Sequence, residues 1–76
     1  MTTTLREIRV SRLLSQRALA RRAGVSHVTV VTAETGRRRP LFESVRKLSA
    51  ALGVPATSIA EFRAALGLPE EVEGDR

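Results

Sequence analysis

The sequence predicts an all-α domain built from five short helices. Glycine and proline residues divide the chain into five segments of helical length, and serine or threonine residues that can cap a helix precede the first three. The fourth segment has apolar residues at helical spacing. A chain of 76 residues is long enough for one domain. We assign residues 1–66 to this domain and expect the acidic residues 67–76 to form a disordered tail.

The first predicted helix begins after Thr4 and ends near Arg12 or Leu13. Thr4 and Glu7 form the pattern of a capping box, in which each side chain accepts the backbone N–H of the other residue. The box satisfies two of the N–H groups that the start of a helix leaves without a partner. These two residues therefore predict where the helix starts.

The second and third predicted helices each lie between a serine and a glycine. A serine hydroxyl accepts a free N–H group at a helix start, and glycine adopts the left-handed conformation that often follows a helix end. Ser15 and Gly24 mark the two ends of a helix whose last residue is Ala23. Ser26 and Gly36 mark the ends of a helix over about residues 27–35.

The composition of residues 27–32 opposes this prediction, because five of the six are β-branched. Each such residue destabilises a helix by up to ~0.7 kcal/mol relative to Ala, and on propensity alone the segment would be a strand. We predict a helix because Ser26 and Gly36 frame one, and because an isolated strand would have no partner.

Apolar spacing predicts the fourth helix over about residues 42–52 and the fifth over about residues 57–66. Gly53 follows the fourth segment and is expected to end it. The residues that share an apolar face are Phe42, Val45, Leu48, Ala51 and Leu52 in the fourth segment, and Ile59, Phe62 and Leu66 in the fifth.

The net charge favours a polyanionic partner. The chain carries +5 in total, and residues 1–66 hold 12 basic and 4 acidic residues. The isoelectric point is near 11.5. A basic body of this kind is typical of nucleic-acid binding. A soluble domain with surplus arginine would give the same charge, so charge alone leaves both interpretations open.

Several classes of protein do not fit the composition. The chain has no cysteine and a single histidine, His27, so disulfides, thiolate sites and multi-histidine metal sites are excluded and we expect no cofactor or metal. We find no glycine-rich phosphate loop and no grouping of nucleophile, base and orienting residue, so we do not expect an enzyme. Without an apolar run of ~20 residues or a signal-peptide core, a cytoplasmic location is expected.

A set of spaced residues between positions 14 and 54 forms a pattern typical of one family. Its elements are Leu14-Ser15-Gln16, Leu19-Ala20, Gly24-Val25-Ser26, Glu34, Gly36, Arg38, Pro40 and Ala51-Leu52-Gly53-Val54. The pattern resembles the XRE family of Cro and lambda-repressor-like proteins, over roughly residues 5–62. The resemblance implies a five-helix lambda-repressor-like domain with a helix-turn-helix at about residues 16–35. The third helix would then enter the major groove of DNA, which is ~12 Å wide.

The same resemblance implies two groups of DNA-contacting residues. The residues expected to read bases are His27, Val28, Thr29 and Thr32. The residues expected to contact the sugar–phosphate backbone are Gln16, Arg17, Arg37, Arg38 and Arg39. The alternative for the first group is a short helix without a reading role, and for the second an ordinary solvated polar surface.

The resemblance also implies a structural ion pair between Arg9 and Glu34, which would join the first and third helices. Dimers of this fold place two recognition helices about one DNA turn apart, ~34 Å. We expect a homodimer that forms through the fifth helix and the residues after it. The interface candidates are Phe62, Leu66 and Leu68, which extend an apolar face beyond what a small domain can bury. The alternative is that these three side chains close the core of the monomer.

Three residues or sets of residues depart from the family pattern. Leu13 stands where the family usually has a glycine at a turn, so strain is expected there. The recognition helix lacks Arg, Asn and Gln, the usual bidentate readers of bases. Ala33 replaces a larger aliphatic residue, which predicts a looser core.

The sequence therefore predicts a sequence-specific transcriptional regulator that binds a short palindrome in double-stranded DNA. The alternative from another class is an antitoxin-type module, whose main partner is a toxin protein and which regulates its own operon.

Overall fold

The computed structural model describes residues 2–68 and shows an all-helical fold in this part of the chain. The α-helices and the single 3-10 helix, η1, are α1 (Leu5–Ser11), α2 (Gln16–Ala23), α3 (His27–Thr35), α4 (Phe42–Leu52), η1 (Ala56–Ser58) and α5 (Ala60–Ala65). The predicted fold class is therefore confirmed. Most of the predicted acidic tail, residues 69–76, lies outside the described residues.

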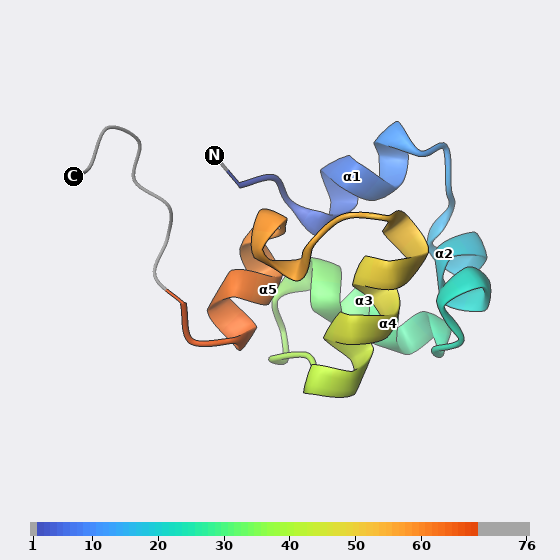
Figure 1. The fold of residues 1–76 in the computed structure, drawn as a ribbon. Helices are drawn as coiled ribbons and strands as arrows, with labels where there is room; N and C mark the ends of the chain where they lie inside the picture. The colour runs from blue at the N-terminus through green and yellow to red at the C-terminus, as the bar shows by residue number, and fades with distance from the viewer. Residues whose placement is uncertain (1, 69–76) are drawn as a thin grey trace.

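The helices surround one small apolar core to which every part of the fold contributes. In Figure 1, α3 and α4 lie at the centre, with α1 above them and with α2 and α5 on opposite sides. The largest fully buried side chains are Leu5, Leu19, Val30, Leu48, Ile59 and Phe62. Because α3 supplies only part of one face to this core, the rest of that helix stays at the surface.

The predicted caps are present at the first three helices. The Thr4 hydroxyl accepts the Glu7 N–H at 3.1 Å, and the Glu7 carboxylate accepts the Thr4 N–H at 3.0 Å. The bond from the Thr4 backbone holds the pKa of Glu7 below its ordinary value. Ser15 and Ser26 cap α2 and α3 by accepting the N–H groups of residues 18 and 29.

Residues 27–35 form a helix despite their β-branched composition, as predicted. The cap at Ser26 and the left-handed Gly36, with φ 73°, bound it at the expected residues. Val30 and Ala33 are buried, at 0% and 1% exposure. Tertiary packing of this inner face therefore outweighs the unfavourable propensity of the segment.

The fifth helix is shorter than predicted. Residues 56–58 form η1, Ile59 is extended with φ −111° and ψ 122°, and α5 begins only at Ala60. The extended backbone pairs with the start of the chain: the Thr3 N–H donates to Ser58 at 3.0 Å, and Thr3 accepts from Ala60 at 2.9 Å. This bridge, formed between distant parts of the sequence, takes Ile59 out of the helix.

The predicted apolar stripe of α4 is wrong at its first position. Phe42 is 71% exposed, whereas Val45, Leu48 and Leu52 are buried. An α-helix turns 300° in three residues, so a three-residue spacing drifts by about 60° per step. Phe42 stands two such steps from Leu48 and has rotated away from the core.

Leu13 has the strained conformation that its position predicted. Its φ is 60°, the only positive value at a non-glycine residue in the described part of the chain. A left-handed conformation is costly for a residue with a Cβ atom, by roughly 1–2 kcal/mol. Its side chain is 92% exposed, so packing contributes little to offset this strain.

None of the described helices is long and apolar enough to cross a membrane.

Candidate nucleic-acid interface

The candidate site is built on α2, the turn at Gly24 and α3. Gly24 has φ 75°, and the N–H groups of Gly24 and Val25 both donate to the carbonyl of Ala20, at 2.9 and 3.0 Å. This turn lets α3 pack against α2 through Val30, while the start of α3 remains at the surface. The geometry is that of two helices joined by a tight turn.

The residues predicted to read bases all remain accessible. Val28 is 66% exposed, and His27, Thr29 and Thr32 are partly exposed. The buried residues of the same helix, Val30 and Ala33, face the core instead. The helix therefore has an inner face that holds it in the domain and an outer face that carries these four side chains.

A cleft of about 420 Å³ lies between α3 and the loop that leads to α4. Its lining residues are Val28, Thr29, Thr32, Arg38, Arg39, Pro40, Leu41 and Ser44. The fold thus brings three predicted base readers together with two of the predicted backbone-binding arginines. His27 and Arg37 are not part of this lining.

Leu41 and Ser44 line the cleft although we did not predict a role for them. Leu41 is the N-cap residue of α4, makes no side-chain capping bond and is 74% exposed. A large apolar residue is unusual at a helix cap, where Ser, Thr, Asp or Asn is preferred. That mismatch is the sequence signal that would have pointed to it.

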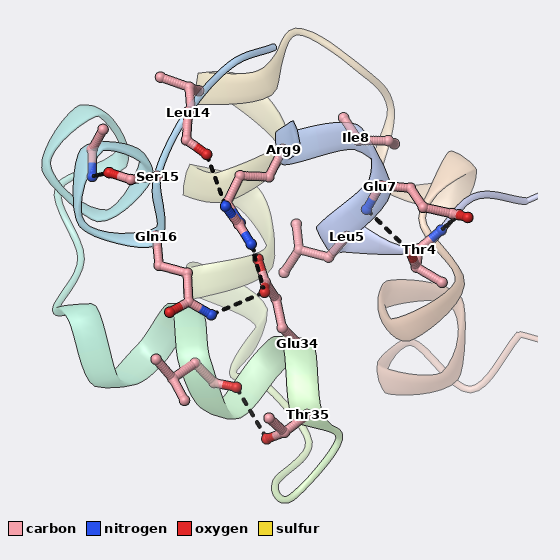
Figure 2. A network of polar contacts seen from close by, with 12 residues as sticks. Thr4, Leu5, Glu7, Ile8, Arg9, Leu14, Ser15, Gln16, Glu34 and Thr35 are labelled. Carbon is pink, nitrogen blue, oxygen red and sulfur yellow. Dashed lines mark hydrogen bonds and ion pairs between the residues drawn. The ribbon is translucent and has the colours of Figure 1, made fainter. Parts of the chain in front are cut away.

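Arg9 and Glu34 form a nearly buried ion pair, with side chains 10% and 5% exposed. Figure 2 shows the Arg9 guanidinium between α1 and the end of α3. It donates to both Glu34 carboxylate oxygens, at 2.5 and 3.2 Å, and to the Leu14 carbonyl at 2.8 Å. This bidentate contact fixes the orientation of α3 relative to α1.

Gln16 belongs to the same network. Its side-chain amide donates to a Glu34 oxygen at 3.0 Å (Figure 2). The contact uses one of the two amide hydrogens, so the other hydrogen remains chemically able to bond a phosphate. Gln16 is the first residue of α2 and Arg9 lies in the last turn of α1, so Glu34 connects the end of α1 and the start of α2 with the end of α3.

The remaining residues of the predicted backbone-binding set are exposed cations. Arg17 lies in the first turn of α2, and Arg37, Arg38 and Arg39 follow α3. By contrast, Arg46 on α4 forms an exposed ion pair with Glu43, and its guanidinium holds the pKa of Glu43 below the ordinary value. The pair neutralises the positive charge of Arg46.

The dimer-interface prediction needs a correction at Phe62. This side chain has 0% exposure and fills the monomer core, so it is not offered to a second copy. Its burial follows from its place on the inner face of α5, beside Ile59. Leu66 is partly exposed and Leu68 is 39% exposed, so these two remain candidates.

In a comparison with protein families, a family model described as helix-turn-helix matches residues 5–59. Comparisons with curated proteins and with solved structures gave no match. The matched range contains α1 to α4 and η1, and therefore the whole of the candidate interface.

Proposed function

Because the chain belongs to the XRE family of helix-turn-helix DNA-binding regulators, we propose that it binds a short palindromic operator as a dimer and regulates transcription there. The observation that carries this proposal is the cleft beside α3. Three accessible residues expected to read bases line it together with two exposed arginines, Arg38 and Arg39. The side chains of α3 would read base edges in the major groove. The arginines would hold the sugar–phosphate backbone.

The two groups of residues are expected to contribute differently. Arginine–phosphate contacts release counterions, so they give affinity that falls with salt and carries little sequence information. Contacts from His27, Val28, Thr29 and Thr32 to base edges would give the preference for one site. Gln16 and the exposed Arg17 and Arg37 would extend the backbone contacts on either side of α3.

Two variants test this division of roles. Arg38→Ala should weaken binding to every duplex and reduce the salt slope of the binding constant by about one. His27→Ala should weaken binding to the preferred site by ~1–3 kcal/mol and leave random duplex unaffected. Both are measured by fluorescence anisotropy over a series of salt concentrations.

The matched control is Arg46→Ala, because Arg46 is an exposed arginine already paired with Glu43 outside the cleft. It should leave both the affinity and the salt slope unchanged. Equal behaviour of Arg38→Ala and His27→Ala on all sequences would contradict the division of roles. Failure of the unaltered protein to bind any duplex at low salt would contradict the proposed function.

Dimerisation is the second part of the proposal. Leu66 and Leu68 are accessible apolar residues that follow the end of α5, and they support an interface there. Analytical ultracentrifugation at micromolar concentration should show a dimer, alone or on a palindromic duplex. A monomer under both conditions would remove this part while leaving DNA binding intact.

The antitoxin alternative has support from a different surface. Val10 and Leu13, at the end of α1, are 50% and 92% exposed and lie outside the cleft beside α3. An accessible apolar pair of this kind suits a protein partner. Co-purification of a toxin from the native host would favour this alternative. Tight operator binding by the protein purified without any partner would favour the proposal of a transcriptional regulator.

A further inference from the structure

The outer face of α3 offers few hydrogen-bond donors to a base. The Thr32 hydroxyl donates its single hydrogen to the carbonyls of its own helix, with Val28 at 2.9 Å and Thr29 at 3.2 Å. The Thr29 hydroxyl lies 2.9 Å from that of Ser26, which also caps the helix. The Thr32 hydroxyl therefore keeps only an acceptor oxygen and a methyl group for an outside partner, and the Thr29 hydroxyl is engaged with Ser26 as either donor or acceptor.

Apolar groups complete the same surface. Val28 on α3 and Leu41 across the cleft are 66% and 74% exposed, and both line the cleft with Pro40. Such exposure of two branched aliphatic side chains is unfavourable in water and is relieved when an apolar group covers them. The cationic groups of Arg38 and Arg39 line the same cleft. The cleft therefore combines methyl groups with positive charge.

This combination matches one feature of the major groove. Among the four bases only thymine carries a methyl group there, at C5, and 5-methylcytosine presents a methyl at the same place. Each such methyl lies near the phosphates of its own strand, which Arg38 and Arg39 would neutralise. The bidentate pairs by which Arg, Asn or Gln side chains distinguish guanine and adenine are absent from α3.

We propose that the cleft between α3 and the following loop recognises the C5-methyl group of pyrimidines, with Val28 and Leu41 as the specificity-determining residues. The proposal rests on the proposed DNA-binding function and deepens it, because it names the chemical group that is read. It also makes cytosine methylation within the site a way to tighten binding. Burial of one methyl group corresponds to about fourfold in affinity.

The first test replaces thymine by deoxyuridine, which removes the C5-methyl and leaves base pairing unchanged. The preferred duplex is selected from random DNA with the full chain, and each thymine is then replaced in turn. The dissociation constant should rise about fourfold at each contacted position, with an unchanged salt slope. Equal affinity for all deoxyuridine duplexes would overturn the proposal, although DNA binding itself would stand.

The second arm places cytosine or 5-methylcytosine, each paired with guanine, at the positions that respond to deoxyuridine. The methylated duplex should bind about fourfold more tightly than the unmethylated one. Equal binding of the two duplexes would show that a C5-methyl group on cytosine is not recognised, and would overturn the proposal for pyrimidines in general. Absence of any selected site or duplex binding would instead refute the DNA-binding function on which both arms depend.

Variants locate the contact on the protein. Val28→Ala and Leu41→Ala should each bring the ratio of the dissociation constants for the deoxyuridine duplex and the thymine duplex toward one. Val10→Ala is the matched control, because Val10 is an exposed valine on α1 outside the cleft, and its ratio should stay unchanged. If Leu41→Ala shifts only the sedimentation of the protein, the cleft holds a second copy instead and the proposal fails.

Discussion

At the scale of single residues, Leu13 is the non-glycine residue of the described fold whose backbone is in the strained left-handed conformation. It holds a φ of 60° with a side chain that is 92% exposed. Leu13→Gly should raise the free energy of unfolding by about 1 kcal/mol, because relief of the left-handed strain exceeds the added chain entropy of glycine. In a domain of this size that corresponds to an increase in melting temperature of about 4–8 °C.

Circular dichroism during heating measures this change. Leu13→Ala is the control, because it shortens the exposed side chain while keeping the Cβ atom that causes the strain, and it should leave the melting temperature near that of the parent. A melting temperature of Leu13→Gly at or below the parent value would show that the turn carries no strain.

Ser49 is the second residue whose effect can be read from its surroundings. It lies on the inner side of α4 at 8% exposure, and its hydroxyl oxygen is buried without a hydrogen-bond partner in the described structure. An unsatisfied buried hydroxyl destabilises a fold by roughly 1–3 kcal/mol. Ser49→Ala should therefore raise the free energy of unfolding in urea by about 1 kcal/mol. A loss of stability would reveal a bond to the hydroxyl in solution.

At the scale of helices, Glu34 is the residue on which the mutual orientation of α1, α2 and α3 depends. It accepts hydrogen bonds from Arg9 and Gln16 while only 5% of its side chain is exposed. Glu34→Gln keeps the shape and removes the charge, so it leaves the Arg9 guanidinium buried and uncompensated. We expect the free energy of unfolding to fall by about 3–5 kcal/mol, measured by urea denaturation.

The control for this variant is Glu43→Gln, which breaks the exposed pair with Arg46 on α4. Solvent screens exposed pairs, so this change should have no measurable effect on stability. Equal losses in the two variants would show that the burial of Glu34 is unimportant.

The helices that could be predicted from sequence are those whose ends are set by neighbouring residues. Ser15, Gly24, Ser26 and Gly36 act on backbone groups within a few positions, so α2 and α3 begin and end where the sequence indicates. The start of α5 could not be placed in this way, because Ile59 is extended by a bridge to Thr3, 56 positions earlier.

The candidate site shows the same limit. The accessible positions of α3 are expected from the family resemblance, and the burial of Val30 and Ala33 agrees with that expectation. The place of Leu41 across the cleft from Val28 and the bond from Gln16 to Glu34 arise only when separate segments meet in space, although the apolar cap at Leu41 is itself a signal in the sequence. Helical spacing also misplaced Phe42, because a three-residue repeat drifts around the helix and loses the core within two steps.

At the scale of the whole molecule, the bridge between Thr3 and Ile59 joins the first residues of the chain to the last helix. A second contact reinforces it, because the Glu61 carboxylate of α5 accepts the Leu5 N–H at 2.8 Å. Thr3→Pro removes the N–H that donates to Ser58. We expect a loss of about 1 kcal/mol or more in the free energy of unfolding, measured in urea.

Thr3→Val is the control, because it keeps the backbone N–H and the preference for an extended conformation. It should retain the parent stability. If both variants lose stability equally, the Thr3 side chain and not the backbone bridge is responsible.

The β-branched composition of α3 has a consequence for folding thermodynamics. A peptide of residues 26–36 would be too short and too poor a helix former to stay helical in isolation, so the reading surface exists only in the native state. Under the proposed function, melting of the domain and loss of affinity for its DNA site would then be one transition. Operator duplex at one hundred times its dissociation constant should stabilise the native state by about 2.7 kcal/mol through mass action. A thermal-shift titration can therefore rank operators without any label on the DNA.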